Sequence, residues 1–249
     1  MAPLKNMTQT APASQEETIL AALRGFTANP DLSFRPQVYR FLLDAIVRGV
    51  LPPHTSLSEA FIAESMEVSR TPVREALAQL ADERLVNIYR KVGTIVAPIS
   101  LSQLEEGRFA RSTLECANHV QLAQTITPAQ LTEFGQIVED QRRAVAAGNV
   151  DAFFELDERM HRRLFEFAGR AHVWEMLQPM KRQFDRVRWL LLDRVEEHAQ
   201  RALHEHEQIL AQMASRNVAQ LGATVASHID RVGSHLPAVY ERVPDYFVE

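Results

Sequence analysis

Four side chains that can ligate a metal ion interrupt helical faces that are otherwise apolar. Asp157 and His161 lie four residues apart on one face of a predicted helix, and His206 and His228 fall within the apolar stripes of two later helices. A buried polar group without a partner costs roughly 1–3 kcal/mol. All four side chains therefore need partners inside the folded protein.

Two arrangements would satisfy these four residues, and the spacing alone leaves both open. One is a divalent metal site, for which three imidazoles and one carboxylate suit Zn²⁺ best, with Ni²⁺ or Mn²⁺ as alternatives. The other is a hydrogen-bond network within the core. His204 lies on a polar helical face with Gln200 and Gln208, so it is expected to point into solvent, in contrast to His206.

The helices that would position these residues follow from apolar periodicity and from boundary signals such as Thr127-Pro128 and Gly148-Asn149. No segment beyond residue 98 has the pattern of a strand. Six helices are predicted there, at 101–124, 128–147, 150–168, 171–196, 198–215 and 217–241. This all-helical region, residues 99–249, is the expected second domain.

The region 35–98 has a different pattern, with three helices followed by two short β-prone runs. The runs are Leu85–Tyr89 and Thr94–Ala97, which predict a hairpin. Three helices and a hairpin, with a tight turn before the third helix, form a winged helix-turn-helix. Residues 1–34 are expected to be a flexible tail, with a weak helical pattern to which no role is assigned.

The third helix of this region begins with side chains suited to DNA. Arg70 and Arg74 share one helical face, opposite the apolar Val73 and Leu77. Arginine at the start of a recognition helix can bind guanine with two hydrogen bonds, while hydroxyls and free backbone N–H groups suit phosphate. The predicted DNA contacts, including those of the hairpin, are Ser69, Arg70, Thr71, Arg74, Lys91, Gly93 and Thr94.

Composition limits the alternatives. The 249 residues are enough for two domains, no apolar run approaches the roughly 20 residues of a membrane span, and the start is no secretory signal. Cys116 is the only cysteine, which excludes an intrachain disulfide, so a cytoplasmic protein is expected. The net charge is +1 for residues 35–98 and −5 for 99–249, so DNA binding is inferred from the motif and not from charge. A generic winged-helix interaction module is the alternative.

The N-terminal region resembles the GntR family of bacterial repressors. The resemblance is carried by Val38–Gly49, Leu57–Glu59 and Val68–Leu77 and covers residues 36–98. It implies that Arg70, Thr71 and Arg74 contact DNA from the recognition helix and Gly93 from the wing. His54 departs from the family pattern, which usually has glycine there.

The C-terminal region resembles the FCD domain, the effector module of the FadR-like branch of that family, through Arg111–Glu115, Asp157–Leu164, His206–Leu210 and Ser227–Ile229. The resemblance implies an antiparallel six-helix bundle, nearer the shorter VanR-like members, with metal ligands at Asp157, His161, His206 and His228. It also implies a small-carboxylate effector bound near the metal by Arg111. An interhelix salt bridge is the other interpretation of Arg111. Arg170 stands where the family usually has asparagine.

The expected protein is thus mostly helical and is a ligand-responsive transcription repressor, not an enzyme. As a homodimer it would bind an inverted-repeat operator in double-stranded DNA. A small organic acid would be its effector. The first alternative is a repressor for which the metal ion itself is the signal. The second is a metal-dependent hydrolase, against which the sequence offers no general-base motif, nucleophile elbow or phosphate loop.

Overall fold

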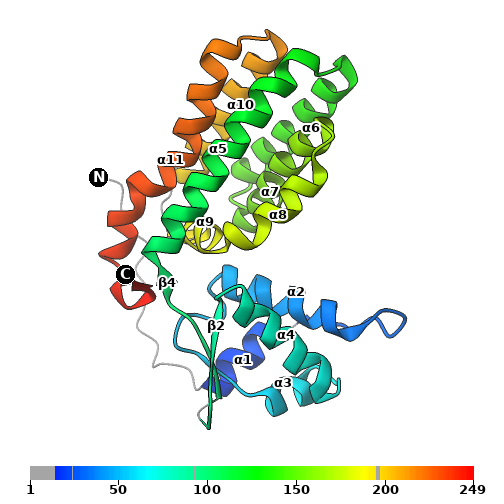
Figure 1. Ribbon diagram of the computed structural model, residues 1–249, viewed down its shortest axis with the longest axis vertical. Helices are drawn as coiled ribbons and strands as arrows, with labels where there is room; N and C mark the ends of the chain where they lie inside the picture. The colour runs from blue at the N-terminus through cyan, green and yellow to red at the C-terminus, as the bar shows by residue number, and fades with distance from the viewer. Residues whose placement is uncertain (1–14, 24, 92, 195–196) are drawn as a thin grey trace. The chain divides into compact units, whose positions relative to one another are not determined.

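The computed structural model describes residues 15–23, 25–91, 93–194 and 197–249 (Figure 1). The chain divides into two compact units, the first ending at Ala97 and the second beginning at Pro98, except that residues 47–49 group with the second. Helices dominate both units. No helix in the described ranges is both long and apolar enough to cross a membrane.

The N-terminal unit contains four helices and a small sheet. The helices are α1 (Gln15–Leu23), α2 (Phe34–Val47), α3 (Glu59–Ser65) and α4 (Arg70–Asp82). The strands are β1 (Ser56–Leu57), β2 (Val86–Tyr89) and β3 (Gly93–Val96), in the antiparallel order β1-β3-β2. The predicted hairpin is present, and β1 adds a third strand that the sequence analysis did not anticipate.

Helix starts in this unit follow local capping. Ser58 is the N-cap of α3, and its hydroxyl accepts a hydrogen bond from the Phe61 backbone N–H. Ser56 lies before the cap, in strand β1. Ser69 is the N-cap of α4, whose apolar stripe is buried as its spacing predicts. His54 has φ 71°, the left-handed conformation that glycine adopts most easily. At this position the chain therefore places a histidine in a backbone conformation that suits glycine.

Part of the segment predicted as a flexible tail is helical instead. Ile19, Ala22 and Leu23 of α1 are buried in the apolar core of the N-terminal unit. These three residues share one helical face, and burial of that face stabilises the helix more than its weak local pattern suggests. The remainder of the predicted tail up to residue 14 lies outside the described residues.

The C-terminal unit is a helical bundle with one small parallel sheet. Its helices are α5 (Leu101–Thr125), α6 (Pro128–Ala146), α7 (Val150–Phe167), α8 (Ala171–Met180), α9 (Arg182–Arg194), α10 (His198–Ala214) and α11 (Val218–Tyr240). Helices α5 and α11 pack along each other, and α6 packs against α7 and α10 (Figure 1). After the short helix η1 (Pro244–Tyr246), β5 (Phe247–Val248) pairs with β4 (Ile99–Ser100).

The single helix predicted for 171–196 is wrong, because this segment forms α8 and α9 with a break at Lys181. Pro179 lies in the last turn of α8 and has no N–H to donate to the carbonyl group one turn earlier, which weakens the helix at this point. Among the described residues the bundle therefore has seven helices, not the six of the VanR-like form. Residues 195 and 196, at the predicted helix end, lie outside the described residues.

Candidate metal centre and DNA-binding surface

The four residues predicted to ligate a metal meet in the interior of the bundle. Asp157 and His161 come from α7, His206 from α10 and His228 from α11, and one potential ligand atom of each lies within 4.8 Å of all the others. His206 Nε2 is 3.3 Å from Asp157 Oδ1 and 3.3 Å from His228 Nε2. His204 points away from this cluster, with a side chain that is 69% exposed.

Each imidazole in the cluster also has a polar neighbour for its second ring nitrogen. The hydrogen-bonded neighbours are Gln141 Oε1, 2.9 Å from His206 Nδ1, and Glu205 Oε2, 2.9 Å from His228 Nδ1. Glu115 Oε2 lies 2.6 Å from His161 Nδ1, a close contact without hydrogen-bond geometry. Oxygen acceptors at Nδ1 favour the tautomer that carries its proton there and leaves Nε2 bare. Such outer contacts orient histidine ligands around protein-bound metals.

The facing nitrogens have a direct electrostatic consequence. With Nδ1 of both His206 and His228 donating outward, their two Nε2 lone pairs face each other beside the Asp157 carboxylate. Neither ring nitrogen of His161 has a hydrogen-bond partner among the described residues. If the cluster were only a hydrogen-bond network with these tautomers, the Nε2 lone pairs of His206 and His228 would repel each other and accept no hydrogen bond. One divalent cation between the rings would instead attract both lone pairs and the Asp157 carboxylate. The residues present therefore fit a metal with three nitrogen ligands and one oxygen ligand.

Burial sets the protonation states that such a site requires. It lowers the pKa of His228 to about 3 and holds the pKa of His206 well below its ordinary value, so both rings are neutral at pH 7. Burial alone would raise the pKa of Asp157, but the surrounding charges, of which Arg188 is the largest contributor, outweigh burial and lower that pKa. Neutral imidazoles and an ionised carboxylate are the forms that ligate metals.

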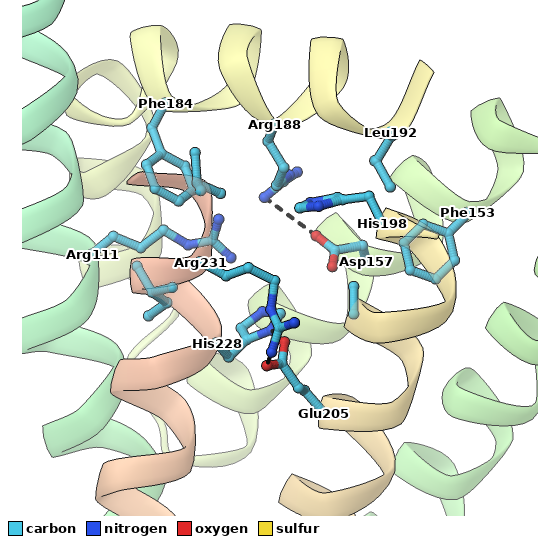
Figure 2. Close-up of a pocket in the computed structure, with 13 residues that line it drawn as sticks. Arg111, Phe153, Asp157, Phe184, Arg188, Leu192, His198, Glu205, His228 and Arg231 are labelled. Carbon is cyan, nitrogen blue, oxygen red and sulfur yellow. Dashed lines mark hydrogen bonds and ion pairs between the residues drawn. The ribbon is translucent and has the colours of Figure 1, made fainter. Parts of the chain in front are cut away.

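Arg111 lies beside the cluster, as the family resemblance implies. It extends from α5 into a pocket that is also lined by Asp157 and His228, and it is 1% exposed (Figure 2). Its Nε lies 2.5 Å from Glu115 Oε1, one turn along the same helix, while its Nη2 is buried without a hydrogen-bond partner among the described residues. The salt bridge of Arg111 is thus within one helix and not between helices. Its Nη2 remains available to donate a hydrogen bond to a ligand.

Several residues around the centre were not identified from the sequence. They are the outer contacts Glu115, Gln141 and Glu205 and the pocket residues Arg188, His198 and Arg231. The available signal was a polar residue at an apolar spacing: Arg188, for example, falls one turn after the buried Phe184. Periodicity does not reveal which helices face each other, so it could not assign these residues to one site.

Arg170, the departure from the family pattern, connects helices outside the pocket. Its guanidinium donates to Asn118 Oδ1 at 2.9 Å and to Gln121 Oε1 at 2.5 Å. Both acceptors belong to α5, and Arg170 is the N-cap residue of α8. Arg170 therefore joins the start of α8 to α5 and is not among the residues that line the pocket.

The N-terminal unit presents the predicted recognition residues at the start of α4. Ser69, Arg70, Thr71 and Arg74 are exposed, and the Arg74 side chain is 70% exposed. Arg74 Nε donates to Glu59 Oε2 at 3.2 Å, which holds the guanidinium near the start of α3. This surface offers arginine and hydroxyl donors together with the unpaired N–H groups of a helix start.

The wing exposes two of the three residues predicted to contact DNA. Lys91 and Gly93 are exposed and have φ values of 66° and 122°, so the backbone turns tightly at the wing tip. Thr94 is only 4% exposed, because it lies on the central strand β3, opposite Leu57 and Ile88. The prediction that its side chain contacts DNA is therefore wrong.

Comparisons with known proteins give the same division of the chain. Residues 34–96 match the family model for bacterial regulatory proteins of the gntR family, and residues 106–231 match the FCD domain. The HTH-type transcriptional repressor RspR of Escherichia coli is 31% identical over 221 residues, covering 89% of this chain and 96% of that protein. The gluconate operon transcriptional repressor of Bacillus subtilis is 26% identical over 192 residues, covering 75% and 78%.

Solved structures agree at the level of the fold. McbR/YncC of E. coli superposes with a TM-score of 0.72 at 19% identity, covering 85% of this chain and 99% of that one. A putative GntR regulator from Rhodococcus superposes with a TM-score of 0.70 at 23% identity, covering 83% and 99%. With its winged helix-turn-helix and its FCD domain, the chain belongs to the GntR family of transcription regulators.

Proposed function

We propose that this regulator is a repressor that holds a divalent metal ion in its FCD domain and changes its affinity for DNA when a small organic acid binds beside the metal. Repressor names among its relatives support the direction of regulation. The observation that carries the proposal is the cluster of bare Nε2 atoms and one carboxylate beside the unpaired donor of Arg111.

Asp157, His161, His206 and His228 would hold the ion, with Zn²⁺ the best match to their donor set and Ni²⁺ or Mn²⁺ as alternatives. When bound, the ion would supply a Lewis-acidic position for one oxygen of a carboxylate. Arg111 would bind another oxygen of the acid, since a guanidinium forms strong charge-assisted hydrogen bonds with carboxylates. An arginine on the protein surface could not take this role, because the acid would bind inside the pocket. Arg111 is buried and lines that pocket.

The pocket favours an organic effector over the metal ion as the signal. A metal-only sensor needs no arginine with a free donor next to its ligands, whereas a carboxylate sensor does. A hydrolytic function has less support, because the relatives are named as transcriptional repressors and a DNA-binding unit precedes this domain.

For DNA, the exposed start of α4 would enter the major groove and the tip at Lys91 and Gly93 would lie against the backbone. One recognition helix reads only a few base pairs. A homodimer on an inverted repeat doubles these contacts, and two-fold symmetry matches that of such an operator.

The proposal is tested with the full-length protein and the DNA upstream of its own gene. Fluorescence anisotropy would measure DNA affinity with and without a panel of organic acids, for wild type and for Arg111→Ala. We expect an acid to change the affinity of the wild type about 5–150-fold, the usual range of allosteric coupling. Arg111→Ala should lose the response and keep its metal. An equal response in both proteins would contradict the proposed effector site.

A further inference from the structure

Three guanidinium groups, each from a different helix, converge on the pocket beside the metal ligands (Figure 2). Arg111 comes from α5, Arg188 from α9 and Arg231 from α11. His198, at the start of α10, adds an imidazole from a fourth helix. The family resemblance implied only Arg111 at this place. Three guanidiniums and an imidazole offer more hydrogen-bond donors than a single carboxylate requires.

Each arginine already has a carboxylate neighbour but keeps unused donors. The neighbours are Glu115 for Arg111, Glu158 for Arg188 and Glu205 for Arg231. The buried nitrogens without a hydrogen-bond partner among the described residues are Arg111 Nη2, Arg188 Nε and Nη1, Arg231 Nε and His198 Nδ1. Arg188 Nη1 lies 3.2 Å from Asp157 Oδ2, an ion-pair contact without hydrogen-bond geometry. Buried donors in this state are costly, and a ligand rich in acceptors would satisfy them.

The number of donors exceeds what one acid group can accept beside a metal. A carboxylate has two oxygens, and if the metal binds one, the other faces Arg111. The unpaired donor nitrogens of Arg188 and Arg231 are then left for a second anionic group on the same ligand. The acidic residues on the pocket wall, Asp157 and Glu205, each contact a histidine as well as an arginine, so they do not satisfy all of the arginine donors.

The rest of the wall is apolar. The uncharged lining residues are Phe153, Phe184, Leu192, Ala202, Ile229 and Val232. No serine, threonine, tyrosine, asparagine or glutamine lines the pocket in the described part of the chain. Hydroxyl groups on the carbon chain between two acid groups would therefore face hydrocarbon and lose their hydrogen bonds to water. The cavity holds only about 20 Å³, room for a water molecule, so a ligand must be short and must displace side chains as it enters.

We propose that the effector is a short dicarboxylate with an unsubstituted hydrocarbon middle, and not a sugar acid. This inference rests on the proposed function and specifies its ligand class. One acid group would lie at the metal and Arg111, and the other between Arg188 and Arg231. The apolar side chains would cover the carbon chain between them.

Isothermal titration of the full-length, metal-loaded protein with four acids separates these features. Succinate is the reference, butyrate lacks the second acid group, tartrate adds two hydroxyls to the diacid, and gluconate is a polyhydroxy monoacid. We expect succinate to bind at least tenfold more tightly than each of the others. The reason is that butyrate leaves two guanidiniums unpaired, while the hydroxyls of tartrate and gluconate lie against apolar walls.

A variant tests the second acid position separately. Arg231→Gln should weaken succinate binding about tenfold or more and leave butyrate binding unchanged. Arg201→Gln, which removes a half-exposed arginine outside the pocket, should change neither. Metal content is measured for each variant, because Arg231 also contacts Glu205, which holds His228. If Arg231→Gln loses metal, the relative affinities of the wild type for the four acids still test the dicarboxylate assignment.

The outcomes distinguish this inference from the function on which it rests. Butyrate that binds as tightly as succinate, or tighter binding of tartrate or gluconate, would overturn the dicarboxylate assignment and leave a carboxylate sensor in place. If none of the four acids binds the metal-loaded protein, the dicarboxylate inference and the proposed carboxylate effector both fail.

Discussion

Replacing Gln141 with methionine should weaken metal binding without removing any metal ligand. Gln141 is fully buried on α6, and its Oε1 lies 2.9 Å from His206 Nδ1. Methionine has a similar volume but no comparable acceptor, so the His206 ring loses the contact that keeps its proton on Nδ1. Loss of an outer contact to a histidine ligand typically lowers metal affinity 10–100-fold, or about 1.4–2.8 kcal/mol. The cost of a buried donor without a partner, about 1–3 kcal/mol, gives the same range.

Competition between the protein and a chromophoric zinc chelator at pH 7.5 would measure this change. Gln136→Met is the matched control, because Gln136 lies on the same helix but is exposed and donates only to Asp140. The control should bind zinc as the wild type does. If Gln141→Met binds zinc within twofold of the wild type, the role assigned to the outer contacts is wrong.

Three further predictions concern DNA binding, packing and pH. Arg74→Ala should weaken operator binding by about 1–3 kcal/mol and relax base preference, as measured by anisotropy on operator variants; unchanged preference would argue against a base contact. Gly107→Ala should lower the free energy of unfolding by about 1–3 kcal/mol in urea titrations, because the added Cβ would lie 2.6 Å from the Met180 carbonyl oxygen; equal stability would show that α8 shifts easily. Burial lowers the pKa of His119 to about 3, below the value of about 6.5 expected when unfolded, so the unfolded chain gains a proton first as the pH falls. Metal-free wild type should therefore lose about 2 kcal/mol between pH 6.5 and 5 that His119→Leu retains, and parallel pH profiles of the two proteins would contradict this.

The four candidate ligands could be selected from the sequence because burial leaves a periodic trace. Asp157 and His161 share a helical face with large apolar residues, and His206 differs from His204 only in the face on which it lies. The structure brings the first three together with His228 and leaves His204 exposed. Local turn and capping signals likewise predicted most helix boundaries in both units.

Features that depend on contacts between helices could not be predicted in this way. Helix α1 has only a weak apolar periodicity in the sequence. Its stability comes from packing of residues such as Ile19 into the core of the N-terminal unit. Thr94 has the residue type of a wing contact, but it is buried on the central strand of the sheet. Arg188 and Arg231 belong to helices far apart in the sequence, and only packing of those helices brings them to one pocket.

Metal content of the purified protein tests the central claim most directly. Native mass spectrometry and elemental analysis would be applied to wild type, His206→Ala and His204→Ala. We expect one divalent ion per chain in the wild type and in His204→Ala, and an ion largely lost from His206→Ala, because only His206 faces the other ligands. A wild type without bound metal after growth and dialysis in zinc, or a His206→Ala protein that keeps its ion, would contradict the account.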